Sequence, residues 1–424
     1  MHLLQMCALQ QLVGFIIWFS IVLAWSSQAL AEALDPIPLD KANVIVCDGL
    51  LNDQHCNFVI DTGLVFGSIN ERVAIAMGLR KLDSNGVTFT TPSGRTGTAP
   101  EYADIEISIG ERKIRLSSAG AGRKEALEEF LGRSVGATLG MDVLKQQILI
   151  LEDFKFRFGS TVPAGFQRVS PPMMDWTPEG IPCLQVTLPV LGNRSFHLAT
   201  GTNMELSVTQ EFADILRRSG HAQRAAHSPG AEGPNLDMNE TIIIEKIVVV
   251  NTEFRNVPAV ILKVNMIGMP LLGRLNIAID GPNRQIYVAE SPNGSLSEFP
   301  MNASGMGVVF KSPTRLRVLG VRESSPAAAA GVLRGDEVIE VDGKSPSDLS
   351  FFQIQKLLSQ DGKTIRVVLF RNHKRLEKDL LLKRTFQYPP VWKPTKATEQ
   401  GFEKFIKSES MGEDPRASRP LQEE

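Results

Sequence analysis

The stretch Phe58-Val59-Ile60-Asp61-Thr62-Gly63 constrains the possible folds of this chain more than any other segment. Three apolar residues typical of a buried strand lead directly into a carboxylate, a hydroxyl and a glycine. Asp is disfavoured within strands, and burying its charge without partners is costly. The pattern therefore predicts that Asp61 is either a turn residue or a chemically active group held at the end of a strand.

A second, weaker copy of this arrangement occurs later, at Phe196-His197-Leu198-Ala199-Thr200-Gly201. Each copy reaches an apolar-glycine pair further along, which we assign to Leu139-Gly140 in the first copy and Leu272-Gly273 in the second. Two β-rich units of matching order indicate a duplication, with the units related by a pseudo-two-fold axis.

Hydrophobic periodicity predicts mainly β structure in both units. Residues 44–46 and 58–60 are expected to pair as a hairpin, and residues 105–109 alternate with the period of a half-buried strand. Residues 87–99 surround a Pro-Ser-Gly turn and predict a second hairpin. At the same place in the second unit, residues 221–240 are rich in Gly, Pro and polar residues and predict a loop.

A short helix is expected after each copy of the motif. Asn70 is a predicted N-cap and Gly78 a predicted terminator in the first unit. Thr209 and Gly220 are expected to play the same parts in the second unit.

The triplet, its second copy and the apolar-glycine pairs resemble the aspartic peptidases, in particular the retropepsin/pepsin-like branch. This resemblance implies two β-barrel lobes, at residues 36–160 and 175–290, with a cleft between them. It implies a flap at residues 87–99. It also implies a catalytic motif in the first lobe, made of Asp61, Thr62 and Gly63.

The second lobe departs from the family at its decisive position. Aspartic peptidases use two facing carboxylates that share one proton, so that one acts as an acid while the other activates water. Ala199 stands where the partner Asp is expected, although Thr200 and Gly201 remain. A methyl group can neither hold a proton nor orient water, so we expect a weak or inactive peptidase as a monomer. Alone, Asp61 is expected to titrate like an ordinary carboxyl group.

Two routes to an active enzyme stay open at this stage. In a homodimer, the first lobes of two chains would pair and bring two Asp61 carboxylates together, giving an active aspartic endopeptidase. Alternatively, Glu205 lies four residues beyond Gly201 and would supply the missing acid. Without either route, the lobes would form a peptidase-shaped cleft that holds polypeptide without cutting it.

Residues 304–384 carry a third, ordered set of signals. Residues 325–332 are typical of a capped helical turn, residues 333–343 of a turn, a strand and an Asp-Gly hairpin, and residues 351–359 of a helix. These signals are similar to those of bacterial PDZ domains. The resemblance implies that a peptide's C-terminal carboxylate binds the loop and first strand, and that the peptide adds as a strand beside them. The implied peptide-binding residues are Gly305, Met306, Gly307, Val308, Val309 and Phe310.

The N-terminus has the layout of a secretory signal. The apolar run 12–25 is followed by the small-x-small triplet Ala29-Leu30-Ala31, which predicts a signal peptide at residues 1–31 and export to the periplasm or the extracellular space. An uncleaved signal would instead anchor the protein in a membrane. A linker is expected at residues 291–303 and a charged, disordered tail at residues 393–424.

Charge and cysteine content set the remaining expectations. The 45 basic and 47 acidic residues give no basic excess, so nucleic acid is not an expected partner. Polypeptides are the expected ligands, with no metal and no cofactor. Cys47 and Cys56 flank a predicted hairpin turn and are expected either to form a disulfide or to be buried free thiols.

Overall fold

The computed structural model describes residues 37–38, 44–110, 112–152, 155–169, 176–224, 240–289, 299–300, 302–312 and 314–383. The predicted signal peptide and the predicted charged tail lie outside these ranges, as does most of the predicted linker. Within the described ranges, no helix is both long enough and apolar enough to cross a membrane.

Six strands close into the first barrel, in the order β2-β3-β9-β4-β8-β7. They are β2 (Ile45–Leu51), β3 (Gln54–Ile60), β4 (Ser68–Asn70), β7 (Glu101–Ile109), β8 (Arg112–Gly122) and β9 (Ala137–Leu139). The barrel also carries the helices α2 (Glu71–Ala76), α3 (Glu125–Leu131) and α4 (Met141–Leu144). A separate hairpin is formed by β5 (Val87–Thr90) and β6 (Thr96–Ala99).

A second barrel repeats this order, as β13-β14-β19-β15-β18-β17, and closes through pairing of β13 with β17. Its strands are β13 (Cys183–Leu188), β14 (Gly192–Ala199), β15 (Leu206–Thr209), β17 (Thr241–Val249), β18 (Thr252–Leu262) and β19 (Met266–Gly268). Its helices are α5 (Gln210–Arg218) and α6 (Met269–Leu272). The identical strand order in the two barrels is what a duplicated unit is expected to give.

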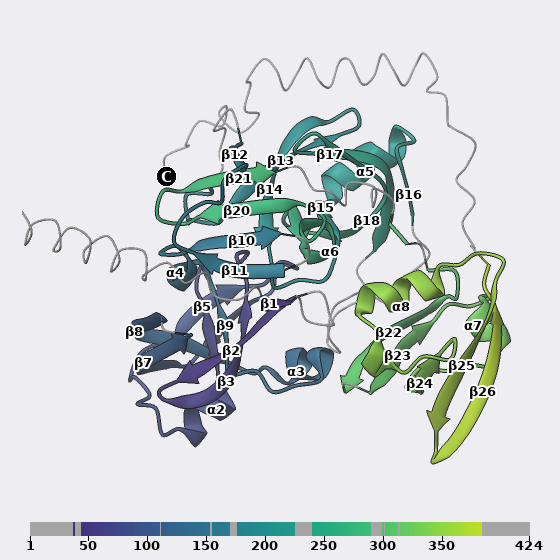
Figure 1. The fold of residues 1–424 in the computed structure, drawn as a ribbon, viewed down its shortest axis with the longest axis horizontal. Helices are drawn as coiled ribbons and strands as arrows, with labels where there is room; N and C mark the ends of the chain where they lie inside the picture. The colour runs from purple at the N-terminus through teal and green to yellow at the C-terminus, as the bar shows by residue number, and fades with distance from the viewer. Residues whose placement is uncertain are drawn as a thin grey trace, which may run out of the picture.

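The two barrels are joined by a six-stranded sheet, seen between them in Figure 1. Its strands, in spatial order, are β1 (Ile37–Pro38), β11 (Lys155–Gly159), β10 (Ile148–Glu152), β20 (Asn276–Asp280), β21 (Gln285–Ala289) and β12 (Gln167–Arg168). At its centre, β10 of the first unit pairs antiparallel with β20 of the second, with Ile148 opposite Asp280. One hydrophobic core runs through both barrels, so they fold as one body.

A third unit lies beside the barrels and has its own core (Figure 1). Its antiparallel sheet consists of β22 (Met306–Ser312), β23 (Arg315–Val321), β24 (Glu337–Val341), β25 (Thr364–Arg371) and β26 (Lys374–Leu381), in that order. The helices α7 (Pro326–Ala329) and α8 (Phe351–Leu358) and the short 3-10 helix η1 (Pro346–Asp348) complete it. The predicted mainly β architecture, with two barrels and a C-terminal unit, is confirmed.

Local sequence signals account for most of these elements. The side chain of Asn70 accepts a hydrogen bond from the Arg72 amide at the start of α2, and Gly78 follows in a left-handed conformation. Thr209 caps α5 in the same way. The loop expected at residues 221–240 is partly wrong, because β16 (Ala222–Arg224) adds to the edge of β17. Residues 225–239 lie outside the described residues.

The cysteines resolve one of the sequence alternatives. Cys47, Cys56 and Cys183 are free thiols in this structure. In the β2–β3 hairpin, Cys47 lies opposite Phe58 and Cys56 lies opposite Gly49, so the register does not bring the two thiols face to face. Burial raises the pKa of the Cys47 thiol to about 12, as expected for a cysteine used as a small apolar residue.

Candidate functional site

Asp61 lies immediately after β3, at the junction between the two barrels. Its backbone amide donates to the carbonyl of Leu139, at 2.9 Å, which continues the parallel pairing of β3 with β9. Its carboxylate atom Oδ1 accepts hydrogen bonds from the amides of Gly63, at 2.9 Å, and Gly201, at 3.2 Å. Both barrels therefore contribute to holding this one carboxylate.

Thr62 and Thr200 connect the two barrels by a reciprocal set of buried hydrogen bonds. The Thr62 hydroxyl donates to the carbonyl of Leu198 at 2.6 Å, and the Thr200 hydroxyl donates to the carbonyl of Ile60 at 2.8 Å. Thr200 Oγ1 also accepts from the Thr62 amide at 3.0 Å. Each threonine thus satisfies polar groups at the end of the strand of the opposite barrel.

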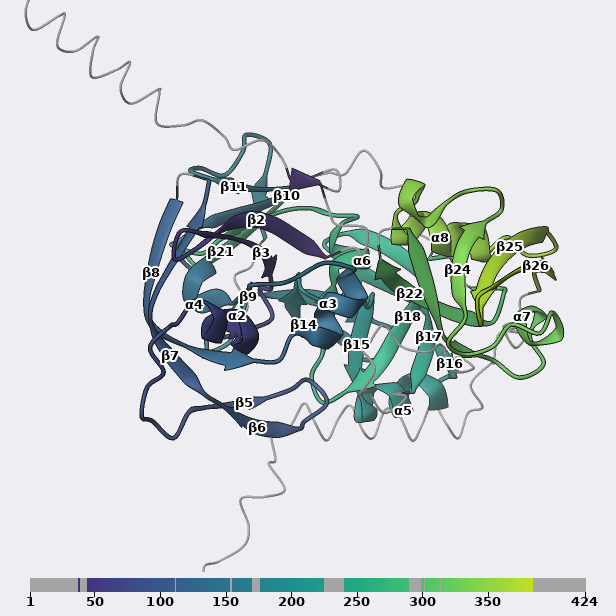
Figure 2. The same cartoon turned by 90° about the horizontal axis from the view of Figure 1, so that it is seen from below.

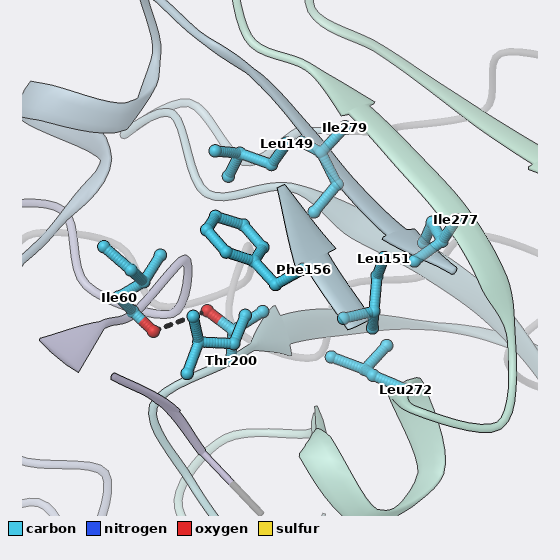
Figure 3. Close-up of a pocket in the computed structure, with 9 residues that line it drawn as sticks. Ile60, Leu149, Leu151, Phe156, Thr200, Leu272, Ile277 and Ile279 are labelled. Atoms are coloured by element: carbon cyan, nitrogen blue, oxygen red, sulfur yellow. Dashed lines mark hydrogen bonds between the residues drawn. The ribbon is translucent and has the colours of Figure 1, made fainter. Parts of the chain in front are cut away.

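An apolar floor lies beneath these threonines. Figure 3 shows Thr200 bonded to Ile60, with the side chains of the inter-barrel sheet around them. The floor is lined by Ile45, Ile60, Leu149, Leu151, Phe156, Thr200, Leu272, Ile277 and Ile279. The space between these side chains is only ≈ 10 Å³, about the minimum for one water, and its walls are apolar. The threonine bonds are therefore shielded from bulk solvent.

The glycines of the two triplets allow the loops to approach closely. A Cβ added to Gly201 would lie 2.5 Å from Cγ of Asp61, and one added to Gly63 would lie 2.8 Å from Cβ of Ala199. These two contacts correspond under the pseudo-two-fold relation. Ala199 therefore occupies the position that mirrors Asp61, and its side chain, which is 3% exposed, is a methyl group.

The structure corrects the apolar-glycine pair of the second barrel. Ala199 pairs with Gly268 and Leu198 with Ile267, as Ile60 pairs with Leu139 in the first barrel. Gly268 precedes α6 as Gly140 precedes α4, so the equivalent pair is Ile267-Gly268. The assignment to Leu272-Gly273 was wrong, because Gly273 ends α6 instead.

Asp61 does not titrate like an ordinary carboxyl group, contrary to the sequence expectation. Burial raises its pKa, and the Gly63 and Gly201 amides and the nearby positive charge of Lys124 offset part of this rise. Burial in turn lowers the pKa of the Lys124 ammonium to about 8, against the opposing effect of Asp61. The Nζ atom of Lys124 donates to the hydroxyl of Ser68.

Lys124 is the member of this site that sequence analysis missed. It stands between β8 and α3, in a segment with no recognisable motif, and only the closure of the first barrel brings it near Asp61. The site thus holds one carboxylate and one ammonium group. The two facing carboxylates of an aspartic peptidase are not both present.

Glu205 has a different charged neighbour, Arg274. The charge that stabilises its ionised form is that of Arg274, while burial raises its pKa to about 7. Arg274 stacks in turn over the ring of Phe299, at 3.7 Å from its centroid. The charged neighbour that acts on Asp61 is Lys124. The arrangement does not support Glu205 as the replacement acid.

The β5–β6 hairpin reaches from the first barrel to the second. The carbonyl of Pro92, at its tip, accepts a hydrogen bond from the Lys263 amide at 3.0 Å. Gly94 lies against the Lys263 side chain. Figure 2 shows the hairpin extending along one side of the molecule, at the bottom of the view. The predicted hairpin at residues 87–99 is confirmed.

The Gly-x-Gly loop of the third unit is shaped by its own side chains. Gly305 has φ +75°, and a Cβ there would collide with Ser325, so glycine is required. Its amide donates to Oδ1 of Asn302 at 3.1 Å, and the Met306 amide donates to Oγ of Ser304 at 3.2 Å. Two of the amides predicted to bind a carboxylate are therefore engaged within the loop. Gly307 and Val308, the other two residues of the predicted carboxylate loop, lie in β22 and pair with Gly320 and Val318 of β23.

Comparison with known proteins identifies part of this third unit. Residues 317–372 match the family model of the PDZ domain. No curated protein matches the chain. The chain therefore contains a PDZ domain, a peptide-binding module, as its sequence predicted.

Proposed function

We propose that this chain is an exported polypeptide-binding protein, built on an aspartic-peptidase-like pair of lobes that has lost its catalytic dyad. The observation that carries the proposal is Ala199, which mirrors Asp61 across the pseudo-two-fold axis while the threonine hydrogen bonds around it are intact. The two strand ends that would each hold an aspartate are therefore in place, but only one of them carries a carboxylate.

The chemistry explains why one carboxylate is insufficient. Peptide hydrolysis at such a site needs one carboxylate to activate water and one carboxylic acid to protonate the substrate. A positioned acid or base contributes about 10²–10⁴-fold, and groups that act as a unit fail together. The cleft between the barrels would then hold extended polypeptide beneath the β5–β6 hairpin without hydrolysing it efficiently.

A second candidate is an active endopeptidase formed by two chains. It is favoured by Asp61 itself, which keeps the hydrogen bonds of an ordered carboxylate. Homodimeric pairing of Asp61 lobes would require the first barrel to exchange its own second barrel for a twin. That exchange breaks the β10–β20 pairing and the Thr62–Thr200 bond. Because the two barrels belong to one chain, the intramolecular pairing is favoured by a high effective concentration.

The PDZ domain gives the protein a separate means of binding polypeptide. A C-terminal tail would add as a strand beside β22, with its last side chain directed toward α8. Met306 and Val308 contribute apolar, buried side chains to this end of the domain, so an apolar C-terminal residue is the expected ligand. The cleft and the PDZ domain would then bind two parts of the same polypeptide.

Amidation of the ligand's C-terminus is expected to weaken binding to the PDZ domain at least tenfold, about 1.4 kcal/mol. The backbone amides would lose a charged acceptor, and hydrogen bonds to charged groups are worth about 1.5–3 kcal/mol. Fluorescence anisotropy with matched free-acid and amidated peptides ending in Val would measure the difference. Equal affinities for the two forms would argue against the predicted binding mode.

Export is proposed from the N-terminal sequence, and cleavage is expected directly after Ala31. The small residues Ala29 and Ala31 close the apolar run as a signal-peptidase site requires. N-terminal sequencing of the mature protein is expected to begin at Glu32. A mature protein that begins at Met1 and stays with the membrane fraction would instead show an anchor.

A further inference from the structure

The peptide-binding strand of the PDZ domain is already covered on its outer face. Met306, Val308 and Phe310 of β22 point into the domain's own core. Val309 points the other way and lies outside that core, yet it is only 8% exposed. An outward-facing residue on a sheet's edge strand is normally in contact with solvent, so another part of the chain covers it.

The covering element is α3 of the first barrel. It packs beside β22, and both views show it next to this edge of the PDZ sheet (Figures 1 and 2). Glu129 of α3 forms an ion pair with Arg317 of β23. Because Arg317 is the cross-strand partner of Val309, this ion pair lies beside the covered residue, on the same face of the sheet.

The other end of α3 reaches the candidate site. Lys124 is the residue that precedes the helix, and it is bonded to Ser68 and acts electrostatically on Asp61. In mid-helix, Glu128 is bonded to Arg72 and to the Val135 amide of the first barrel. This helix of seven residues therefore contacts the PDZ strand, while the residue that precedes it is bonded to Ser68 and acts on the Asp61 carboxylate through its charge.

The opposite wall of the PDZ groove is attached to the second barrel. The guanidinium of Arg274 lies 5.4 Å from the ring centroid of Phe352, in α8. The two elements that would enclose a bound peptide, β22 and α8, are thus each in contact with a different barrel.

We propose that α3 is an internal cap on the PDZ groove, displaced when a C-terminal peptide adds to β22, and that its displacement moves Lys124 away from Asp61. Peptide binding by the PDZ domain and the electrostatic state of the cleft are then coupled, and by linkage each affects the other. This inference rests on the proposed peptide binding. The ion pair between Glu129 and Arg317 is partly exposed, and exposed ion pairs contribute little to stability, so this pair holds the cap only weakly against a competing ligand.

Reversing the charge of Glu129 tests the cap directly. In the full chain, Glu129→Arg is expected to bind a free-acid peptide ending in Val about three- to tenfold more tightly than the wild type, because it removes the attraction to Arg317 and adds repulsion. Combining Glu129→Arg with Arg317→Glu is expected to restore the ion pair and the weaker affinity. Glu125→Gln, an exposed position at the start of the same helix, is the matched control and is expected to bind like the wild type.

Hydrogen exchange supplies a second measurement on the unmodified chain. Saturating free-acid peptide is expected to accelerate amide exchange in residues 125–131 and to increase labelling of Lys124 by an amine reagent, while the amidated peptide does neither. Slower exchange in α3 on peptide binding would show that the helix is a wall of the groove and would contradict the proposal that it is a displaceable cap. An affinity of Glu129→Arg equal to that of the wild type would also contradict it. If no peptide binds to any of these proteins, the proposed PDZ function fails and the inference fails with it.

Discussion

Replacing Ala199 with Asp is expected to create an acid-dependent peptidase. The new carboxylate would face Asp61 across the pseudo-two-fold axis, at the end of a strand whose glycine and threonine neighbours are already in place. Two facing acids share one proton, and this restores the acid and the base together. Since the pair acts as a unit, we expect cleavage of unfolded protein to rise about 10²-fold or more over the wild type.

Two variants control for this gain of activity. Ala199→Asn places a side chain of nearly the same size there but cannot share a proton, and it is expected to stay inactive. Adding Asp61→Asn to Ala199→Asp is expected to abolish the new activity. Cleavage by the wild type that increases with protein concentration and is lost in Asp61→Asn would instead support the homodimer.

The pH profile of the Ala199→Asp variant should report on Lys124. The dyad is active while it carries one proton, between its two apparent pKa values. The ammonium of Lys124 favours loss of that proton and so lowers the upper limit of the active range. Lys124→Gln is therefore expected to move the upper limit to higher pH. An unchanged limit would show that Lys124 does not act on the dyad.

Stability of the same variant should fall as pH rises. Burial raises the pKa of Asp61 above its unfolded value, and a second buried acid beside it raises the upper pKa of the pair further. A carboxyl with a raised folded-state pKa binds its proton more tightly in the folded protein. Its contribution to the free energy of unfolding is therefore complete at pH values below its pKa in the unfolded protein. That contribution is lost as the pH rises through its pKa in the folded protein. Thermal unfolding at several pH values would measure this loss.

Replacing Thr200 with Val is expected to destabilise the paired barrels by about 2–6 kcal/mol. Valine has nearly the same shape, so packing changes little, but the buried Ile60 carbonyl and Thr62 amide each lose their partner. Each buried polar group left without a hydrogen bond costs about 1–3 kcal/mol. Urea unfolding, followed by tryptophan fluorescence, would measure the shift in the transition of the barrels.

Thr88→Val is the matched control, since Thr88 is exposed on the β5–β6 hairpin and the same change of atoms there should alter stability little. The PDZ domain has a separate core and contains no Trp, so its transition, followed by circular dichroism, serves as an internal reference that should not move. A shift in the Thr200→Val variant no larger than in Thr88→Val would show that the threonine bonds do not hold the barrels together. Adding Thr200→Val to Ala199→Asp is expected to reduce the new activity, because the two loops would lose their alignment.

Much of the fold follows from local sequence patterns. The Asp-Thr-Gly triplet after an apolar strand, the Asn70 and Thr209 helix caps and the ordered PDZ signals each depend on residues only a few positions apart. Strand alternation and capping hydrogen bonds are decided at that range, and the sequence contains them in full. The absence of an acid at position 199 is likewise a fact of the sequence.

Other features were decided only by tertiary structure. Both Ile267-Gly268 and Leu272-Gly273 fit the apolar-glycine pattern, and only the register of β14 with β19 distinguishes them. Glu205 was close to the triplet in sequence but is placed with Arg274, while the distant Lys124 is placed with Asp61. The contact of α3 with β22 joins two units that fold around separate cores. Such pairings depend on barrel closure and domain packing, which bring together residues that no local pattern connects.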